Sequence, residues 1–108
     1  MPQISITTTG TLVLNYNPYR KSIIFHNPSA NIMYAQRTDA QSVKAASADL
    51  RLPAGATRTL TWIEDGQDAI VDRWSVIVET GTSTLEYAEF SSAELARLEK
   101  LFVKEVEQ

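Results

Sequence analysis

The chain has 108 residues, of which 44% are hydrophobic, and this is enough apolar material for the core of one ordinary domain. Its formal net charge is -3 and its cations are scattered, which argues against a nucleic-acid-binding surface. The absence of cysteine excludes disulfides and cysteine-based zinc sites. No signal-peptide pattern follows Met1, and no apolar run is long enough to span a bilayer. We therefore expect a protein that folds inside a cell and stays out of membranes.

Alternating polar and apolar residues predict two strands at the N-terminal end. Residues 3–8 alternate, and so do residues 11–16, with Gly10 between them. One face of the second segment carries Leu12, Leu14 and Tyr16. We expect the two segments to pair as a hairpin.

The next segments predict a buried strand, a partner strand and a long loop. Residues 20–26 contain a continuous apolar run, which is typical of a strand covered on both faces. After an Asn-Pro-Ser turn, residues 31–36 are expected to pair back on this strand as a second hairpin. Residues 37–48 are rich in Ser, Ala, Gln and Thr without a firm period, which indicates a long loop with room for a helical turn. Long loops in compact domains are often functional.

The remainder of the first 90 residues continues the strand-and-turn pattern. The further segments with strand character are residues 50–52, 57–63, 74–79 and 84–90. Turn-forming residues separate them, including the acidic segment 64–68. Short strands with a turn every ten or so residues, and no crossover helix between them, predict a mainly β protein. Residues 1–90 are thus expected to form an antiparallel β-sandwich or a jelly-roll-like domain.

The last segment, residues 91–108, predicts a C-terminal α-helix. Ser91 and Glu94 have the spacing of a capping box, in which each side chain accepts from the other residue's backbone N–H. The apolar residues that follow at helical spacing are Leu95, Leu98, Phe102 and Val106. This stripe packs either on its own domain or on a neighbouring molecule, and the sequence leaves both readings open.

No residue set supports catalysis, a metal site or a bound cofactor. His26 is the only histidine, it ends an apolar strand, and the Gly-x-Ser-x-Gly elbow is absent, so a structural role is favoured. Glu64, Asp65 and Asp68 lack the ligand spacing of an EF-hand and indicate a solvated turn. We expect most of the aromatic side chains to pack in the core, namely Tyr16, Tyr34, Trp62, Trp74 and Tyr87. Tyr19 is the exception, since it lies in a turn beside a cation and can anchor a partner.

Several short motifs resemble those of a known group of proteins. Residues 20–27, with the sequence Arg-Lys-Ser-Ile-Ile-Phe-His-Asn, look like a strand found in many small phage proteins. The segments Ile32-Met33-Tyr34, Leu52-Pro53-Ala54-Gly55 and 74–82 are similar to its next strand, its turn and its closing hairpin. Over residues 20–90 the chain thus resembles small β-sandwich virion proteins of tailed bacteriophages, including capsid decoration (cement) proteins. The loop 37–48 is richer in alanine than that pattern, and residues 91–108 lie outside it.

The resemblance implies a structural protein without enzymatic activity. Such a protein binds the major capsid protein on the outside of a phage head, stabilises the shell, and self-associates, with a trimer favoured. Its location would be the capsid surface of the virion, after assembly in the host cytoplasm. The alternatives are a head–tail connector, tail or fibre-associated protein, and a small carbohydrate-binding module. The expected partner-binding residues are Tyr19, Arg20, Arg37, Asp39, Lys44, Leu95, Leu98 and Phe102.

Overall fold

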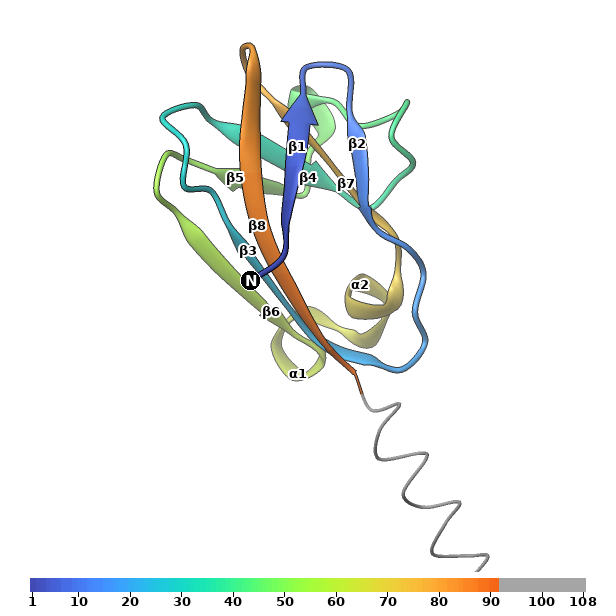
Figure 1. The fold of residues 1–108 in the computed structure, drawn as a ribbon. Helices are drawn as coiled ribbons and strands as arrows, with labels where there is room; N and C mark the ends of the chain where they lie inside the picture. The colour runs from blue at the N-terminus through green and yellow to red at the C-terminus, as the bar shows by residue number, and fades with distance from the viewer. Residues whose placement is uncertain (92–108) are drawn as a thin grey trace, which may run out of the picture.

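The computed structural model describes residues 1–91, which form a mainly β domain with two four-stranded antiparallel sheets (Figure 1). In order across the first sheet, the strands are β1 (Gln3–Thr7), β8 (Thr82–Ser91), β3 (Arg20–His26) and β6 (Thr57–Thr61). Those of the second sheet are β2 (Thr11–Leu14), β7 (Trp74–Val78), β4 (Met33–Gln36) and β5 (Leu50–Leu52). The predicted antiparallel, mainly β architecture is confirmed.

A single hydrophobic core joins the two sheets. Ile23 and Phe25 of β3 are fully buried, as are Val76 of β7 and Met33 of β4 in the other sheet. The rings of Phe25 and Trp74 meet edge to face across the sheets, with their centroids 5.8 Å apart. Each such side chain contributes about 1.5–3 kcal/mol when it is removed from water. The two-residue period of the strands therefore fixes which face of each sheet turns inward.

The strand pairing is nested, and it corrects the predicted hairpins. β1 pairs with β8, β2 with β7, β3 with β6 and β4 with β5, so the first and last strands are neighbours. β1 and β2 lie in different sheets, and so do β3 and β4. The predicted pairings of residues 3–8 with 11–16 and of residues 20–26 with 31–36 are therefore wrong. The predicted closing hairpin of β7 and β8 is replaced by a crossing from one sheet to the other.

Glycine turns carry the chain between the sheets. Gly10 connects β1 to β2 with a φ of +96°, and Gly81 connects β7 to β8 with a φ of +68°. Gly10 also lies under the loop after β4, where a Cβ atom would collide with the carbonyl oxygen of Ala40. Both turns carry the chain from one sheet to the other, so neither closes a hairpin within a sheet.

A pair of short helices replaces the predicted end of β6 and the acidic turn. β6 stops at Thr61, and the chain continues as α1 (Trp62–Asp65) and α2 (Gln67–Val71), separated by Gly66 with a φ of +90°. The hydroxyl of Thr61 accepts from the N–H of Glu64, while a carboxylate oxygen of Asp65 accepts from the N–H of Thr61. This reciprocal cap ends the strand and begins the helix. The predicted strand to residue 63 and turn at 64–68 are thus wrong.

The inward face of β2 also differs from its prediction. Leu14 is buried, but Leu12 is 38% exposed and Tyr16 lies beyond the strand. The register with β7 shifts between Leu12 and Leu14, and such an irregularity breaks the simple alternation of faces.

The remaining predictions concern the loop 37–48 and the C-terminal segment. The loop 37–48 is confirmed, and it contains a single 3₁₀ turn at Ala45–Ser47. β8 continues to Ser91. The predicted C-terminal helix, with Leu95, Leu98 and Phe102, lies outside the described residues.

Substituting Gly10 tests the sheet-to-sheet turn. Gly81→Ala introduces only the penalty of a left-handed backbone, about 1–2 kcal/mol, because nothing lies within 4 Å of the added Cβ. Gly10→Ala adds a collision with backbone and should lose about 3 kcal/mol or more of unfolding free energy. Urea denaturation of both variants measures the difference. Equal losses would contradict the packing described for Gly10.

Candidate functional site

Arg20, expected as a surface cation, is buried. It is 2% exposed, and its Nε lies 2.6 Å from a carboxylate oxygen of Glu89. Its Nη1 donates to the carbonyl oxygens of Ile70 at 2.8 Å and Asp72 at 2.9 Å, and its Nη2 donates to the carbonyl oxygen of Asn15. The planar guanidinium thus satisfies backbone groups from separate segments with donors in a fixed fork.

Because Arg20 is buried, its role is structural: it connects β3 to the segments around α2. The register between β3 and β8 shifts between Arg20 and Ser22, and a bulge of this kind re-aims a side chain. The alternation of residues in the sequence could not reveal the change. Arg20 is therefore not available on the surface as the predicted partner contact.

The loop 37–48 is held against the body. Backbone N–H of Lys44 donates to the amide oxygen of Gln36 at 3.1 Å, and the hydroxyl of Ser75 in β7 donates to the carbonyl of Thr38 at 2.8 Å. Val43 is buried, with 6% of its surface exposed. The loop therefore presents a fixed surface and lies over the β1–β2 turn.

The structure brings only one of the three predicted loop residues to a hollow. Arg37 is exposed, and its Nε lies 3.5 Å from a carboxylate oxygen of Asp72. Asp39 is occupied within the loop, where hydrogen bonding from Ser42 lowers the pKa of its carboxyl group below the usual value. The side chain of Lys44 is exposed.

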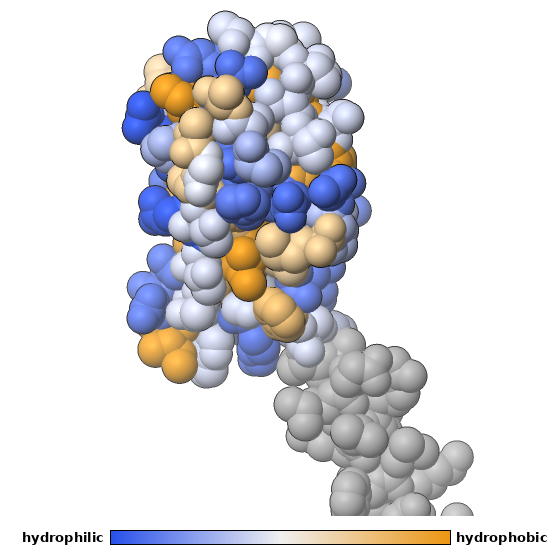
Figure 2. Space-filling view, turned by 60° about the vertical axis from the view of Figure 1, so that its left-hand side comes forward, coloured by the Kyte–Doolittle hydropathy of each residue, from blue (hydrophilic) through white to orange (hydrophobic). Residues whose placement is uncertain are grey.

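Large apolar side chains are exposed where β3 begins and where β6 and β8 end. Thr61, Ser22 and Phe90 are neighbours across the first sheet, and Trp62 and Ile63 follow Thr61 directly. The exposed fractions are 46% for Trp62, 82% for Ile63 and 55% for Phe90, and Lys21 Nζ lies 4.8 Å from the Trp62 ring centroid. We call Lys21, Trp62, Ile63 and Phe90 the end surface. Figure 2 shows one strongly hydrophobic group at the lower left of the body, at the end where α1 lies in Figure 1, and a separate apolar group higher on the same face.

The aromatic residues divide differently from the prediction. Trp74 is buried as expected, and its indole N–H donates to the carbonyl oxygen of Ala69 at 2.8 Å. Trp62 and Tyr16 were expected in the core, but both are exposed. Trp62 lies in a helix instead of a strand, and Tyr16 lies beyond the end of β2, so neither follows the inward alternation. Tyr19 is 53% exposed, as its position in a turn predicts.

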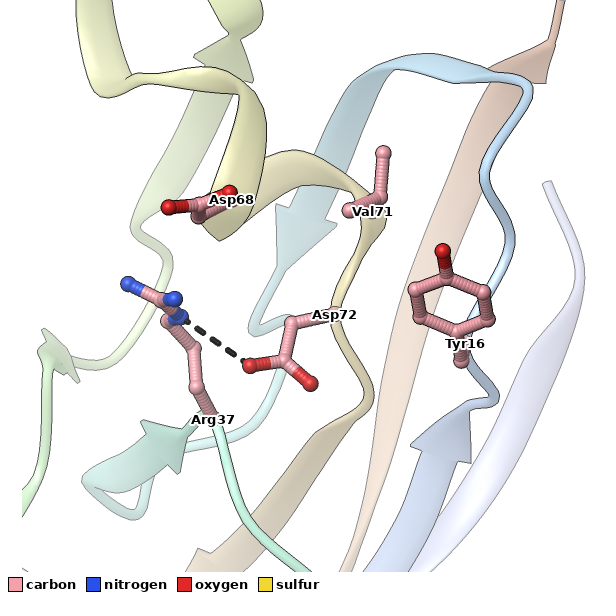
Figure 3. Close-up of a pocket in the computed structure, with 5 residues that line it drawn as sticks. All are labelled: Tyr16, Arg37, Asp68, Val71 and Asp72. Carbon is pink, nitrogen blue, oxygen red and sulfur yellow. Dashed lines mark ion pairs between the residues drawn. The ribbon is translucent and has the colours of Figure 1, made fainter.

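A surface hollow lies beside the helices, and three separate segments form it. Its volume is ≈ 290 Å³, and it is lined by Tyr16, Arg37, Asp68, Val71 and Asp72. Figure 3 shows Arg37 and Asp68 on one side of Asp72 and Tyr16 on the other. The backbone N–H of Asn17 donates to the carbonyl of Val71 at 2.8 Å, which fixes the segment carrying Tyr16 against α2. Of the predicted partner-binding residues that fall within residues 1–91, Arg37 alone lines the hollow.

His26 lies at the end of β3, next to β6. The Nδ1 of His26 lies 2.8 Å from the hydroxyl oxygen of Thr57 on the neighbouring strand. Within residues 1–91, no three His, Asp or Glu side chains are grouped closely enough to hold a metal ion. No helix in the same range has the length and apolar character needed to cross a membrane.

Comparison with protein-family models, with curated proteins and with solved structures finds no match.

The hydrogen bonds of Arg20 predict that substituting Arg20 lowers the unfolding free energy more than substituting its ion-pair partner Glu89. Arg20→Lys removes the fork that binds three carbonyl oxygens and should lower the unfolding free energy by about 2–4 kcal/mol. Glu89→Gln should lose less than about 1 kcal/mol, because the Glu89 side chain is 39% exposed and its charge is screened by water. Urea denaturation compares them, with the exposed Arg51→Lys as the matched control. A loss for Glu89→Gln as large as that for Arg20→Lys would show that the ion pair, and not the carbonyl fork, stabilises this end.

Proposed function

We propose that the protein is a structural binding module that attaches to the outside of a phage head and stabilises it. The major capsid protein is the proposed partner, and the attached copies form a homo-oligomer, with a trimer favoured. The site of action is the capsid surface of the virion, after assembly in the host cytoplasm. The role requires no catalytic chemistry.

The nested strand order supports the finer part of the fold prediction. Pairing of the first strand with the last, the second with the seventh, and so on inward is the winding of an eight-stranded jelly roll. We infer that the chain is a jelly roll, an architecture that occurs in viral capsid and lectin domains. Fold alone does not determine function, so the proposal depends on the surfaces.

The end surface is the observation that carries the proposal. Of the seven large hydrophobic residues exposed within residues 1–91, three belong to the end surface: Trp62, Ile63 and Phe90. Clustered apolar side chains on a small protein are typical of a binding surface, and Trp is enriched among residues that dominate binding energy. Lys21 covers part of the Trp62 ring and adds a cation at the rim, where charge affects association rate and specificity more than affinity.

The arrangement also suits repeated attachment to a shell. Trp62, Ile63 and Phe90 belong to regular elements, α1 and β8, so binding through the end surface does not require a new helix or strand to form. A small surface gives modest affinity per copy, and an oligomer that engages several equivalent positions of the shell at once binds more tightly than one copy alone. A ligand that binds only the assembled shell must stabilise that state.

Binding to heads prepared without the protein tests this proposal. The full chain should bind them saturably and raise their melting temperature. Ile63→Ser should weaken binding about tenfold, because it removes an apolar side chain that is 82% exposed before binding. Leu12→Ser removes an exposed apolar residue from the other sheet and should bind like the parent chain.

Absence of binding, or equal weakening by the two substitutions, would contradict attachment through the end surface. Copy number on the particle separates the sites within a virion. Many copies over the shell fit a decoration protein, whereas a few copies at the tail axis would replace this proposal with a connector or tail-associated role.

A further inference from the structure

The hollow beside α2 has a mixed set of hydrogen-bonding groups. The Asp68 and Asp72 carboxylates can only accept, while the guanidinium of Arg37 can only donate. Arg37 uses its Nε toward Asp72, at 3.5 Å, which leaves its two Nη groups as the donors that complete the set. The hollow thus presents donors and acceptors side by side on fixed elements.

Its charge selects among classes of ligand. Two carboxylates and one guanidinium give the lining a formal charge of about -1. An anionic ligand is repelled by the carboxylates of Asp68 and Asp72, and a simple cation is repelled by the guanidinium of Arg37. A neutral molecule with several hydroxyl groups avoids both conflicts, because each hydroxyl donates to a carboxylate or accepts from the guanidinium.

The remaining lining residues provide an apolar platform. Tyr16 is 64% exposed, and Val71 lies at the same hollow. The C–H face of a sugar ring packs on an aromatic ring in the same way as other apolar surface. A volume of ≈ 290 Å³ lies just below the range of about 300–1,000 Å³ for small-molecule sites, so it accommodates one ring and not a long chain.

We propose that this hollow binds one saccharide residue of a glycan. The sugar ring stacks on Tyr16, and its hydroxyl groups bond to Asp68, Asp72 and Arg37. This activity is separate from attachment through the end surface and does not depend on it. A particle that carried the protein would then present a weak sugar-binding site in many copies, so that affinity rises through multivalency.

Titration of the ¹⁵N-labelled full chain with monosaccharides tests the proposal. The panel comprises neutral hexoses, deoxyhexoses, N-acetylhexosamines and sialic acid, with methylguanidinium as a mimic of a basic side chain. At least one neutral sugar should produce saturable shifts at the amides of Tyr16, Arg37 and residues 68–72. Ordinary ligand efficiency for about a dozen non-hydrogen atoms corresponds to dissociation constants of the order of a millimolar.

Matched variants locate the binding. Tyr16→Ala should abolish the shifts, while Tyr16→Phe keeps the ring and should retain most of the affinity. Asp68→Asn should weaken binding by about tenfold, the effect of one lost charge-assisted hydrogen bond. Glu79→Gln changes a carboxylate after β7, away from the lining, and should have no effect. Because Tyr16 is largely exposed, the Tyr16→Ala spectrum should keep the dispersion of the parent chain, which controls for unfolding.

Three results would overturn the inference. The first is the absence of saturable shifts with every sugar. The second is sugar binding that survives Tyr16→Ala. The third is tighter binding of methylguanidinium than of any sugar, which would assign the hollow to a basic side chain of a protein.

Discussion

The buried guanidinium of Arg20 holds together the end of the molecule on which both proposed surfaces lie. Its contacts reach Glu89 in β8, the carbonyls of Ile70 and Asp72 at α2, and the carbonyl of Asn15 after β2. A buried cation is tolerated only where hydrogen bonds replace its hydration, and here each of the three guanidinium nitrogens donates to an acceptor. The helices are too short to be stable alone, so their positions depend on this network and on the burial of Ile70 in the core.

A second buried polar side chain, that of Asn27, joins separate loops at the opposite end of β3. Asn27 is fully buried, and its amide nitrogen donates to the carbonyl oxygens of Asn31 and Leu52 at 2.7 and 2.9 Å. Its amide oxygen accepts from the hydroxyl and N–H of Ser29. β3 is thus bounded by two buried polar residues, each of which ties loops of one end to the strand. The apolar run between them supplies the core contacts, and the polar residues set where the chain turns.

The alternation of apolar and polar residues predicted where the strands lie better than it predicted which strands pair with one another. The apolar run of residues 20–26 coincides with β3, and the period-free segment 37–48 is a loop. Alternation specifies which face of a strand is buried, but it says nothing of which strand lies beside it, so adjacent segments were paired although they lie in opposite sheets. The helices were missed because four or five residues are too few for a helical period, although the spacing of Thr61 and Glu64 matches a cap. In the candidate site, Arg37 was predicted and Tyr16, Asp68 and Asp72 were not, since the hollow exists only after three distant segments meet.

Attachment through the end surface requires that the end organised by Arg20 faces the partner. An electron cryo-microscopy reconstruction of heads incubated with the full chain tests this directly. The account predicts density for the sandwich with α1 and the end of β8 against the shell, and with the Gly55 turn pointing outward. Density with the Gly55 turn against the shell and α1 exposed, or a shell without the protein, would contradict it.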